Sequence, residues 1–195
     1  MDSETLAIGL TGSFGSGCST LAEGLASMKA EDKFTVFSLS TILKNEWKRA
    51  FRTTAEGERE PVRRELQDYG DQLRALEGRD VLARKAIELA GGENGGSRIV
   101  FDSIRNLGEV DLFRQSFARF FVVAVQCYSE MRWKRVEKRY KALGLGYDEF
   151  RRDDIRDQIE SDLPNGQQVQ LCVDAADIVL TRTLYQWHST KTRRR

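Results

Sequence analysis

Residues 6–21 of this 195-residue chain read LAIGLTGSFGSGCSTL, and no other stretch says more about its structure. An apolar run typical of a buried strand leads into a glycine-rich loop, and the loop leads into a segment with a helical apolar period. The spacing Gly12, four residues, Gly17, one residue, Ser19 is that of the phosphate-binding P-loop, with Cys18 where the motif has lysine. The stretch therefore predicts a strand, a phosphate-binding loop and a helix, in that order.

The chemistry of such a loop depends mainly on its backbone. Glycines allow the chain to turn with its N–H groups pointing inward, and the following helix adds free N–H donors and the positive end of its dipole. The hydroxyl of Ser19 has the place of a Mg²⁺ ligand. The predicted phosphate-binding residues are Gly12, Ser13, Phe14, Gly15, Ser16, Gly17, Cys18, Ser19 and Thr20.

Cys18 removes the positive charge that the motif's lysine brings to the outer phosphates. By analogy with the loss of one preorganised donor in a catalytic site, turnover would fall by roughly 100- to 1000-fold, whereas the backbone cradle for phosphate remains. A thiol at a helix N-terminus is expected to have a lowered pKa, which leaves a redox-sensing role open beside that of a small residue tolerated in the loop.

Composition excludes several classes of protein. The chain is 40% hydrophobic and 31% charged, with a net charge of +1, which favours a globular domain and gives no overall field toward nucleic acid. No apolar run approaches 18 residues, and the N-terminus has no signal-peptide pattern, so neither a membrane span nor secretion is expected. Three cysteines without a metal or disulfide spacing favour a reducing compartment. We therefore predict a cytoplasmic protein.

Apolar runs alternate with helical patterns along the whole chain, which predicts a parallel sheet with helices on both faces. The fold class predicted is a three-layer α/β P-loop fold with five mostly parallel strands. The predicted strands are residues 6–10, 34–37, 98–101, 120–126 and 177–180.

Two long connections interrupt this alternation. The first, residues 39–96, reads as two or three helices, with Leu66, Tyr69, Leu73 and Leu76 on one face, and is predicted to be a helical insert. The second, residues 129–162, is highly charged, and its basic residues recur about once per helical turn. It is predicted to be a mobile lid, with an exposed helical hairpin as the alternative. The predicted core is then 1–38, 97–128 and 163–195, within one domain.

Three segments resemble a known group. GLTGSFGSGCST resembles the P-loop of dephospho-coenzyme A kinase and (deoxy)nucleoside monophosphate kinases. RRELQDYGDQLRALEGRDVLARKA (63–86) is similar to the substrate-side helices of archaeal and phage-type nucleotide kinase-like proteins, and FDSIRNLGEVDLFR (101–114) to their strand-and-turn segment. The chain is also similar to P-loop kinase-like domains fused to deoxycytidylate deaminases, but it lacks the deaminase signature H-x-E…P-C-x-x-C.

The resemblance implies ATP and Mg²⁺ as cofactors and a nucleotide as acceptor. It implies that Asp102, at the end of the third strand, helps to hold Mg²⁺ together with Ser19, and that Arg105 reaches the substrate phosphate or the transferring group. It also implies that Arg74 binds the acceptor phosphate and that lid arginines, Arg135 and Arg139, assist catalysis. For each of these side chains a solvated or structural role is the alternative.

After Cys18 in place of lysine, a second difference from the related kinases follows the second predicted strand. The related kinases place an aspartate there, whereas this chain reads FSLSTILKNEW and has no carboxylate before Glu46. Phosphoryl transfer depends mostly on positioning and charge stabilisation, so an active kinase remains possible. The two departures together leave open a nucleotide-binding module that regulates a partner domain, and assembly as a homodimer is also left open.

Overall fold

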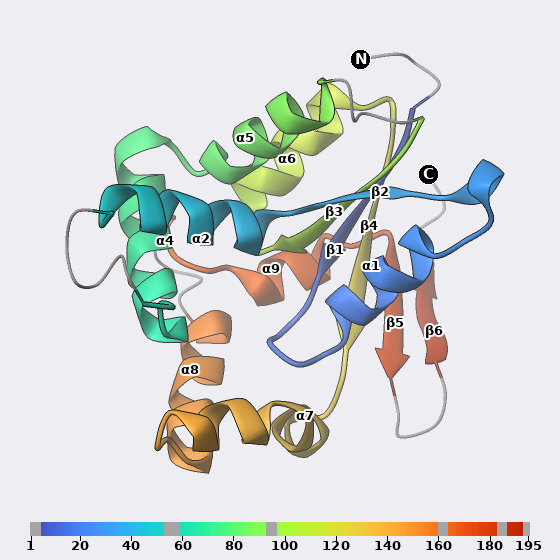
Figure 1. Cartoon of the computed structure of the whole chain (residues 1–195). Coiled ribbons are helices and arrows are strands. Elements are labelled where there is room, and N and C mark those ends of the chain that lie inside the picture. The colour runs from blue at the N-terminus through green and yellow to red at the C-terminus, as the bar shows by residue number, and fades with distance from the viewer. Residues whose placement is uncertain (1–4, 53–58, 93–96, 160–163, 183–186, 193–195) are drawn as a thin grey trace.

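The computed structural model describes residues 5–52, 59–92, 97–159, 164–182 and 187–192. At its centre is a sheet in the order β2-β3-β1-β4-β5-β6 (Figure 1). The neighbouring pairs from β2 to β5 are parallel, and β6 pairs antiparallel with β5 at one edge. The strands are β1 (Leu6–Thr11), β2 (Thr35–Ser38), β3 (Arg98–Ile104), β4 (Arg119–Gln126), β5 (Ile178–Arg182) and β6 (Trp187–Thr192).

The predicted parallel five-stranded sheet with helices on both sides is confirmed, and two differences in the strands matter. The sequence does not predict β6, because WHSTKT is short and polar and its pairing with β5 is a nonlocal choice. β3 is longer than predicted, since Asp102 pairs with Ser38 inside the ladder and the buried Ile104 ends the strand. Asp102 therefore lies within the strand rather than at its end.

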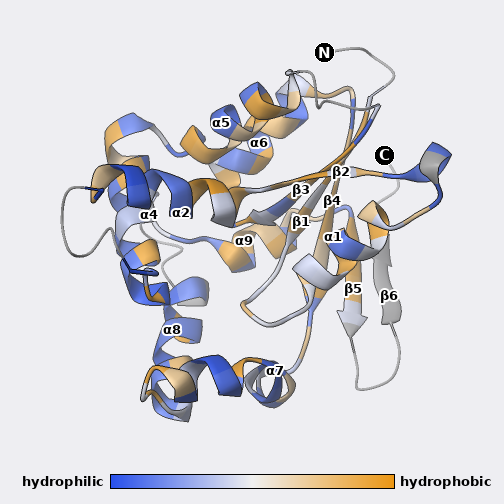
Figure 2. Cartoon of the chain, viewed as in Figure 1, coloured by the Kyte–Doolittle hydropathy of each residue, from blue (hydrophilic) through white to orange (hydrophobic). Residues whose placement is uncertain are grey.

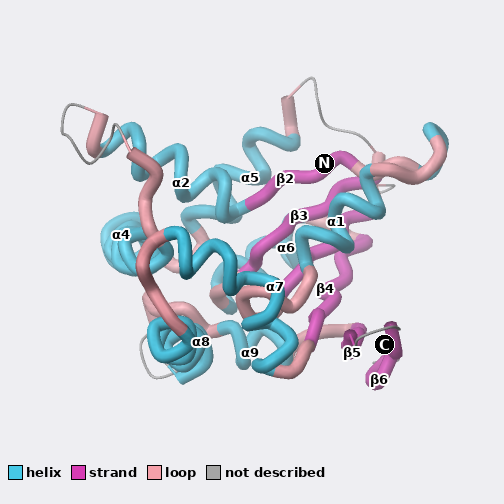
Figure 3. Tube along the Cα trace, turned by 60° about the horizontal axis from the view of Figure 1, so that its bottom comes forward, coloured by secondary structure: helices cyan, strands magenta, loops and turns pink. Residues whose placement is uncertain are grey.

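Helices cover both faces of this sheet and form the outer layers. The helices are α1 (Cys18–Ala26), a short 3₁₀ turn η1 (Ala30–Asp32), α2 (Leu39–Ala50), α4 (Arg63–Glu77), α5 (Val81–Ala90), α6 (Leu107–Ser116), α7 (Ser129–Ala142), α8 (Tyr147–Ile159) and α9 (Val169–Asp174). α1 packs on one face, and α5, α6 and α9 pack on the other (Figures 1 and 3). Among the helices of the described ranges, none combines the length and apolar character needed to cross a membrane.

The core is split into two layers by the sheet, as the alternation of side chains along a strand requires. On β3, Phe101 faces the α6 side and stacks on Phe113 at a ring-centroid distance of 4.1 Å. Val100 faces the α1 side, where it packs with Leu10 and Ala22. The apolar strands between two layers of mixed helices are visible in Figure 2.

Along the chain, α2, α4 and α5 come between β2 and β3. The sequence predicts helices for residues 39–96, and the described part of that range is helical as predicted. Leu66, Tyr69 and Leu73 are wholly or partly buried, but the prediction is wrong for Leu76, which is 84% exposed in the last turn of α4. α7 and α8 follow β4 and form a pair of largely polar helices below the P-loop (Figures 1 and 2). The roles of these regions as substrate insert and lid stay predictions.

Candidate nucleotide site

The loop between β1 and α1 is shaped by close contacts that only glycine permits. A Cβ atom on Gly12 would lie 2.3 Å from the backbone oxygen of Val125 on the neighbouring strand. Gly15 and Gly17 have φ values of +81° and +115°, in the left-handed region that glycine adopts at little cost. α1 begins directly after Gly17, so its first N–H groups open toward the loop without partners inside the helix. The backbone therefore turns as a loop of this glycine spacing requires, and the binding of phosphate by residues 12–20 stays a prediction.

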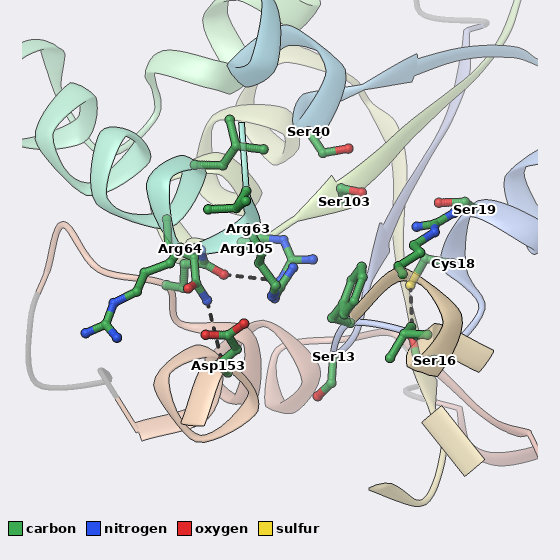
Figure 4. A pocket seen from close by; sticks show the side chains of 18 of the residues that line it. Ser13, Ser16, Cys18, Ser19, Ser40, Arg63, Arg64, Ser103, Arg105 and Asp153 are labelled. Carbon is green, nitrogen blue, oxygen red and sulfur yellow. Dashed lines mark hydrogen bonds between the residues drawn. The ribbon is translucent and has the colours of Figure 1, made fainter. Parts of the chain in front are cut away.

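Cys18 stands at the loop, where Figure 4 shows its side chain, but as a largely buried thiol rather than a charged group. Its side chain is 8% exposed and belongs to the apolar cluster between α1 and the sheet, and its Sγ lies 3.4 Å from Ser16 Oγ. Burial raises the pKa of the Cys18 thiol to about 11, because the thiolate would lose its hydration. The expectation of a lowered pKa is therefore wrong: desolvation outweighs the helix N-terminus, and the residue is a packed, neutral thiol.

Ser19 and Asp102, predicted as metal ligands from segments 83 positions apart, lie together. Ser19 Oγ donates a hydrogen bond of 3.1 Å to Asp102 Oδ2, and Ser103 Oγ donates another of 3.1 Å. Asp102 Oδ1 is buried and has no hydrogen-bond partner among the described residues. Burial raises the pKa of Asp102, and the two hydroxyl hydrogen bonds oppose that rise.

A carboxylate oxygen without a partner beside a hydroxyl is a donor set that suits Mg²⁺, which takes oxygen ligands and completes its shell with phosphate and water. Ser19 and Asp102 would hold the ion, which when bound neutralises phosphate charge. Among the described residues there is no group of three or more acidic, cysteine or histidine side chains for a metal. The site thus fits a cation that shares its shell with a nucleotide.

α7 packs directly against the P-loop. Arg135 Nη1 donates hydrogen bonds to the backbone oxygens of Gly15 (2.9 Å) and Ser16 (3.0 Å). A Cβ on Gly15 would lie 3.1 Å from Val136, which shows how closely the helix packs on the loop. Phe14, at the tip of the loop, packs with the aromatic cluster of α7 and α8 formed around Val136. A guanidinium from α7 thus stands beside the loop that lacks a lysine.

A second arginine of α7 joins this helix to α8 and to the loop. Arg132 is 4% exposed and forms two hydrogen bonds with the carboxylate of Asp154, one of them 2.7 Å long. It also donates to the backbone oxygens of Cys127 (3.0 Å) and Phe14 (3.3 Å). Buried carboxylate–guanidinium contacts of this kind fix geometry. They therefore place α7 and α8 as one unit against the P-loop.

The loop, α2, α4 and the α7–α8 pair enclose a cavity of about 780 Å³ (Figure 4). Its described lining is strongly basic, with seven arginines against two carboxylates. The arginines are Arg63, Arg64, Arg74, Arg105, Arg135, Arg139 and Arg152, and the carboxylates are Glu149 and Asp153. The apolar part of the lining includes Leu39, Leu43, Val62, Leu66 and Leu82. An elongated anion with an apolar portion matches this lining.

Arg105 lines the cavity, where it is bonded to residues that the sequence did not indicate. Its Nη1 donates to Asp157 Oδ2 (3.1 Å) and to Gln167 Oε1 (3.2 Å). Arg63, at the start of α4, donates to the same oxygen of Asp157 and lies over the ring of Phe14 at 4.2 Å. The only sequence signal for Arg63 is its place in the quoted segment 63–86; Asp157 gives none, because it is one of many charges in a polar helix.

Arg74 also borders the cavity, but it is 2% exposed and bound to a buried carboxylate. Its Nε and Nη2 donate to Glu109 Oε1 at 3.3 and 3.1 Å. Glu109 Oε2 in turn accepts from the backbone N–H groups of Arg105 and Asn106. The structure thus ties Arg74 to the turn that carries Arg105. Contact with an acceptor phosphate stays a prediction for Arg74, as catalytic roles do for Arg105, Asp102 and Arg139.

The fold and this site define the class of protein. The sheet order, the P-loop between β1 and α1 and the basic cavity are those of a P-loop, kinase-like, nucleotide-binding fold. Solved structures agree: the crystal structure of TT1252 from Thermus thermophilus is 25% identical with a TM-score of 0.54 and is matched over 93% of this chain and 90% of its own. A shikimate kinase from Acinetobacter baumannii shares the fold at 15% identity and a TM-score of 0.51, over 94% of this chain and 86% of its own.

The family model described as an AAA domain matches residues 8–157. Because this is more than half of the chain, the protein belongs to that family of P-loop proteins, and the resemblance to P-loop kinases is confirmed.

Curated relatives named UPF0200 proteins are similar over part of the chain. One from Sulfurisphaera tokodaii is 30% identical over 68% of this chain and 65% of its own length. One from Methanosarcina acetivorans is 37% identical over 34% of this chain and 36% of its own. The match thus spans less than two thirds of these relatives.

Proposed function

We propose that this protein transfers a phosphoryl group from ATP, with Mg²⁺, to a nucleotide-type acceptor such as a nucleoside monophosphate or a dephospho-coenzyme A-like molecule. The observation that carries the proposal is the convergence of seven arginines on a P-loop cavity beside the Ser19–Asp102 pair. Phosphoryl transfer needs little covalent chemistry from the protein, so positioned positive charge and a metal site supply most of the catalysis.

Within this proposal, the loop residues 12–20 hold the ATP phosphates, and Ser19 and Asp102 hold the metal ion. Arg135 supplies the charge that the missing lysine would bring, since its guanidinium already lies on the loop at Gly15 and Ser16. Arg105 and Arg139 stabilise the transferring group, and Arg74 supports the acceptor phosphate. The apolar lining from α2, α4 and α5 would contact the base or another nonpolar part of the acceptor.

A second function is favoured by a specific observation at the loop. The Cys18 side chain is packed into the core, and the end of β2 offers Ser38 and Ser40, joined by a 2.9 Å hydrogen bond, where a carboxylate would assist the acceptor hydroxyl. A nucleotide-binding module with weak or no turnover, which acts on a partner domain or in a homodimer, is consistent with both features.

One experiment separates the two functions. ADP formation is measured with ATP, with and without Mg²⁺, across nucleoside monophosphates and dephospho-coenzyme A, and melting temperatures are recorded with the same ligands. Acceptor- and Mg²⁺-dependent ADP formation supports the kinase. Stabilisation by nucleotide without turnover supports the module, since a bound ligand raises stability by mass action. In the module, the Cys18→Lys variant would also fail to become a fast enzyme.

A further inference from the structure

Asp157, in the last part of α8, is a fully buried carboxylate outside the phosphate loop. Its side chain has no solvent exposure, and it joins residues from two other segments. Oδ2 accepts from Arg63 at the start of α4 and from Arg105 in the β3–α6 turn, the latter at 3.1 Å. Oδ1 accepts a 2.6 Å hydrogen bond from Gln67, one turn further along α4. We call Asp157, Arg63, Arg105 and Gln67 the arginine wall.

The geometry of the arginine wall leaves donors unused. Arg105 reaches both Asp157 and Gln167 through Nη1 alone, so these contacts leave its Nε and Nη2 for another acceptor. The Nε of Arg63 is buried and has no hydrogen-bond partner among the described residues. Both arginines line the cavity, and Figure 4 shows them side by side in it. A carboxylate that holds one nitrogen of each guanidinium fixes their direction while other donors stay available to an anion.

Two guanidinium groups repel one another, so their juxtaposition at the cavity needs a counter-charge. The nearest acidic groups on α8 have other partners: Asp153 accepts from the Tyr140 hydroxyl at 2.7 Å, and Asp154 binds Arg132. Arg156, beside Asp157 in sequence, points to Asp68 and Asp71 on α4. Among the described residues, Asp157 is thus the carboxylate bonded to both Arg63 and Arg105.

From this arrangement we infer that Asp157 is a positioning residue for the acceptor: it aligns Arg63 and Arg105 so that their remaining donors bind the phosphate of a nucleoside monophosphate. This inference rests on the proposed acceptor site and adds that α8, by carrying Asp157, completes that site. At metal sites, removal of a residue that orients a ligating side chain typically costs roughly 10- to 100-fold in affinity or activity, and we expect the lower end of that range for Asp157.

The test uses the full chain and measures the affinity for AMP, GMP, CMP and dTMP, and separately for ADP with Mg²⁺, by calorimetry. Asp157→Asn should weaken binding of the monophosphate that the wild type prefers by about tenfold and that of ADP by less than about twofold. The matched control is Arg156→Gln, which removes α8–α4 ion pairs but leaves the arginine wall intact. It should retain the wild-type monophosphate affinity.

A double-mutant cycle provides a readout that a purely structural role would not give. If Asp157 acts through Arg105, Asp157→Asn should cause no further loss of monophosphate affinity in an Arg105→Gln background. Should Asp157→Asn fail to fold, Gln67→Ala, which frees Oδ1 of the same carboxylate, should weaken monophosphate binding by about threefold.

The outcomes distinguish failure of the inference about Asp157 from failure of the proposed function. Unchanged or tighter monophosphate binding by Asp157→Asn overturns the inference, and tighter binding would show that Asp157 competes with phosphate. Equal losses in Asp157→Asn and Arg156→Gln also overturn it, because docking of α8 would then explain both. If the wild type binds Mg²⁺–ADP but none of the monophosphates, the inference fails, because it names a nucleoside monophosphate, and the proposed function is left with dephospho-coenzyme A-like acceptors.

Discussion

The phosphate loop and the arginine wall face the same cavity but are built in opposite ways. The loop consists of consecutive residues, 12–20, and works through backbone geometry that glycine allows. The wall draws side chains from α4, the β3–α6 turn and α8, and works through buried charges up to 94 positions apart. The loop is therefore a local structure with a fixed shape, whereas the wall exists only when α8 is packed in place.

The contrast extends to the sulfur of Cys18 and the carboxylate of Asp157. Each is buried, but the thiol is neutral and packs with apolar groups, and the carboxylate is held by two guanidinium groups and an amide. Burial of a charge is tolerated only when it is paired and hydrogen-bonded. The arginines that make the site positive thus come from α4, α7, α8 and the β3–α6 turn, and none comes from the loop.

The largest effect is expected at the glycine that fixes the loop. In Gly12→Ala the new Cβ would collide with the backbone oxygen of Val125, which can move only if β4 moves. We expect loss of the ADP-induced melting shift and destabilisation by about 3 kcal/mol, in the range of overpacking and backbone strain.

Gly24→Ala is the matched control, since no atom outside the neighbouring helix backbone lies within 4 Å of the Cβ added there, in the last turn of α1. It should stabilise the protein by up to about 1 kcal/mol through helix propensity. Wild-type ADP affinity in Gly12→Ala would show that the loop does not bind phosphate through this backbone.

The next largest effect is expected at Asp102, which we propose holds Mg²⁺ together with Ser19. Asp102→Asn keeps an acceptor for Ser19 but loses the negative charge, so turnover should fall by about 100-fold. The affinity for ADP should also lose its dependence on Mg²⁺, which calorimetry at several Mg²⁺ concentrations would measure. Ser103→Ala, which removes a hydrogen bond to the same carboxylate but leaves its charge, should keep that dependence. A Mg²⁺ dependence that persists in Asp102→Asn would contradict the assignment.

A smaller effect is expected where α7 meets the loop. Arg135→Gln removes the guanidinium from the oxygens of Gly15 and Ser16, and ADP affinity should fall by about tenfold, as for loss of one charged hydrogen bond. Lys138→Gln makes the same change of charge on an exposed position of α7 outside the cavity lining. It should alter ADP affinity by less than about twofold. Equal losses in the two variants would mean that only the net charge of α7 matters.

The smallest effect concerns the pH dependence of stability. A cysteine thiol has an ordinary pKa of 9.0, which burial raises to about 11 for Cys18 in the folded protein. The unfolded chain therefore releases this proton first as pH rises, so the folded state is disfavoured from about pH 9 upward. At pH 9.5 the contribution is a loss of about 0.8 kcal/mol in the free energy of unfolding.

Urea unfolding at pH 8 and pH 9.5 measures this loss as the difference between wild type and Cys18→Ala. Burial also raises the pKa of Cys172, which adds a loss of its own to every protein compared. Cys18→Ala should therefore lose about 0.8 kcal/mol less than wild type between the two pH values, and Cys127→Ala, whose cysteine is only partly buried, should lose as much as wild type. A loss of equal size in all three proteins would place its source elsewhere.

The amino-acid sequence alone was enough to predict the glycine-rich loop and the alternation of strands and helices along the chain. It also predicted that helices form both outer layers. These follow from local rules: glycine spacing fixes a backbone shape, and apolar periodicity separates strands from helices. The resemblance to P-loop kinases also linked Ser19 to Asp102, because β3 lies beside β1 in this fold.

Only the tertiary structure decided the edge strand β6, the inward position of the Cys18 thiol and the arginine wall. Pairing of β6 with β5, like the meeting of Asp157 with Arg63 and Arg105, depends on which distant segments become neighbours. In a charged helix such as α8, composition does not distinguish the buried carboxylates, Asp154 and Asp157, from those in solvent. That distinction arises from packing, because a charge gains a partner or loses its water only when the chain has folded around it.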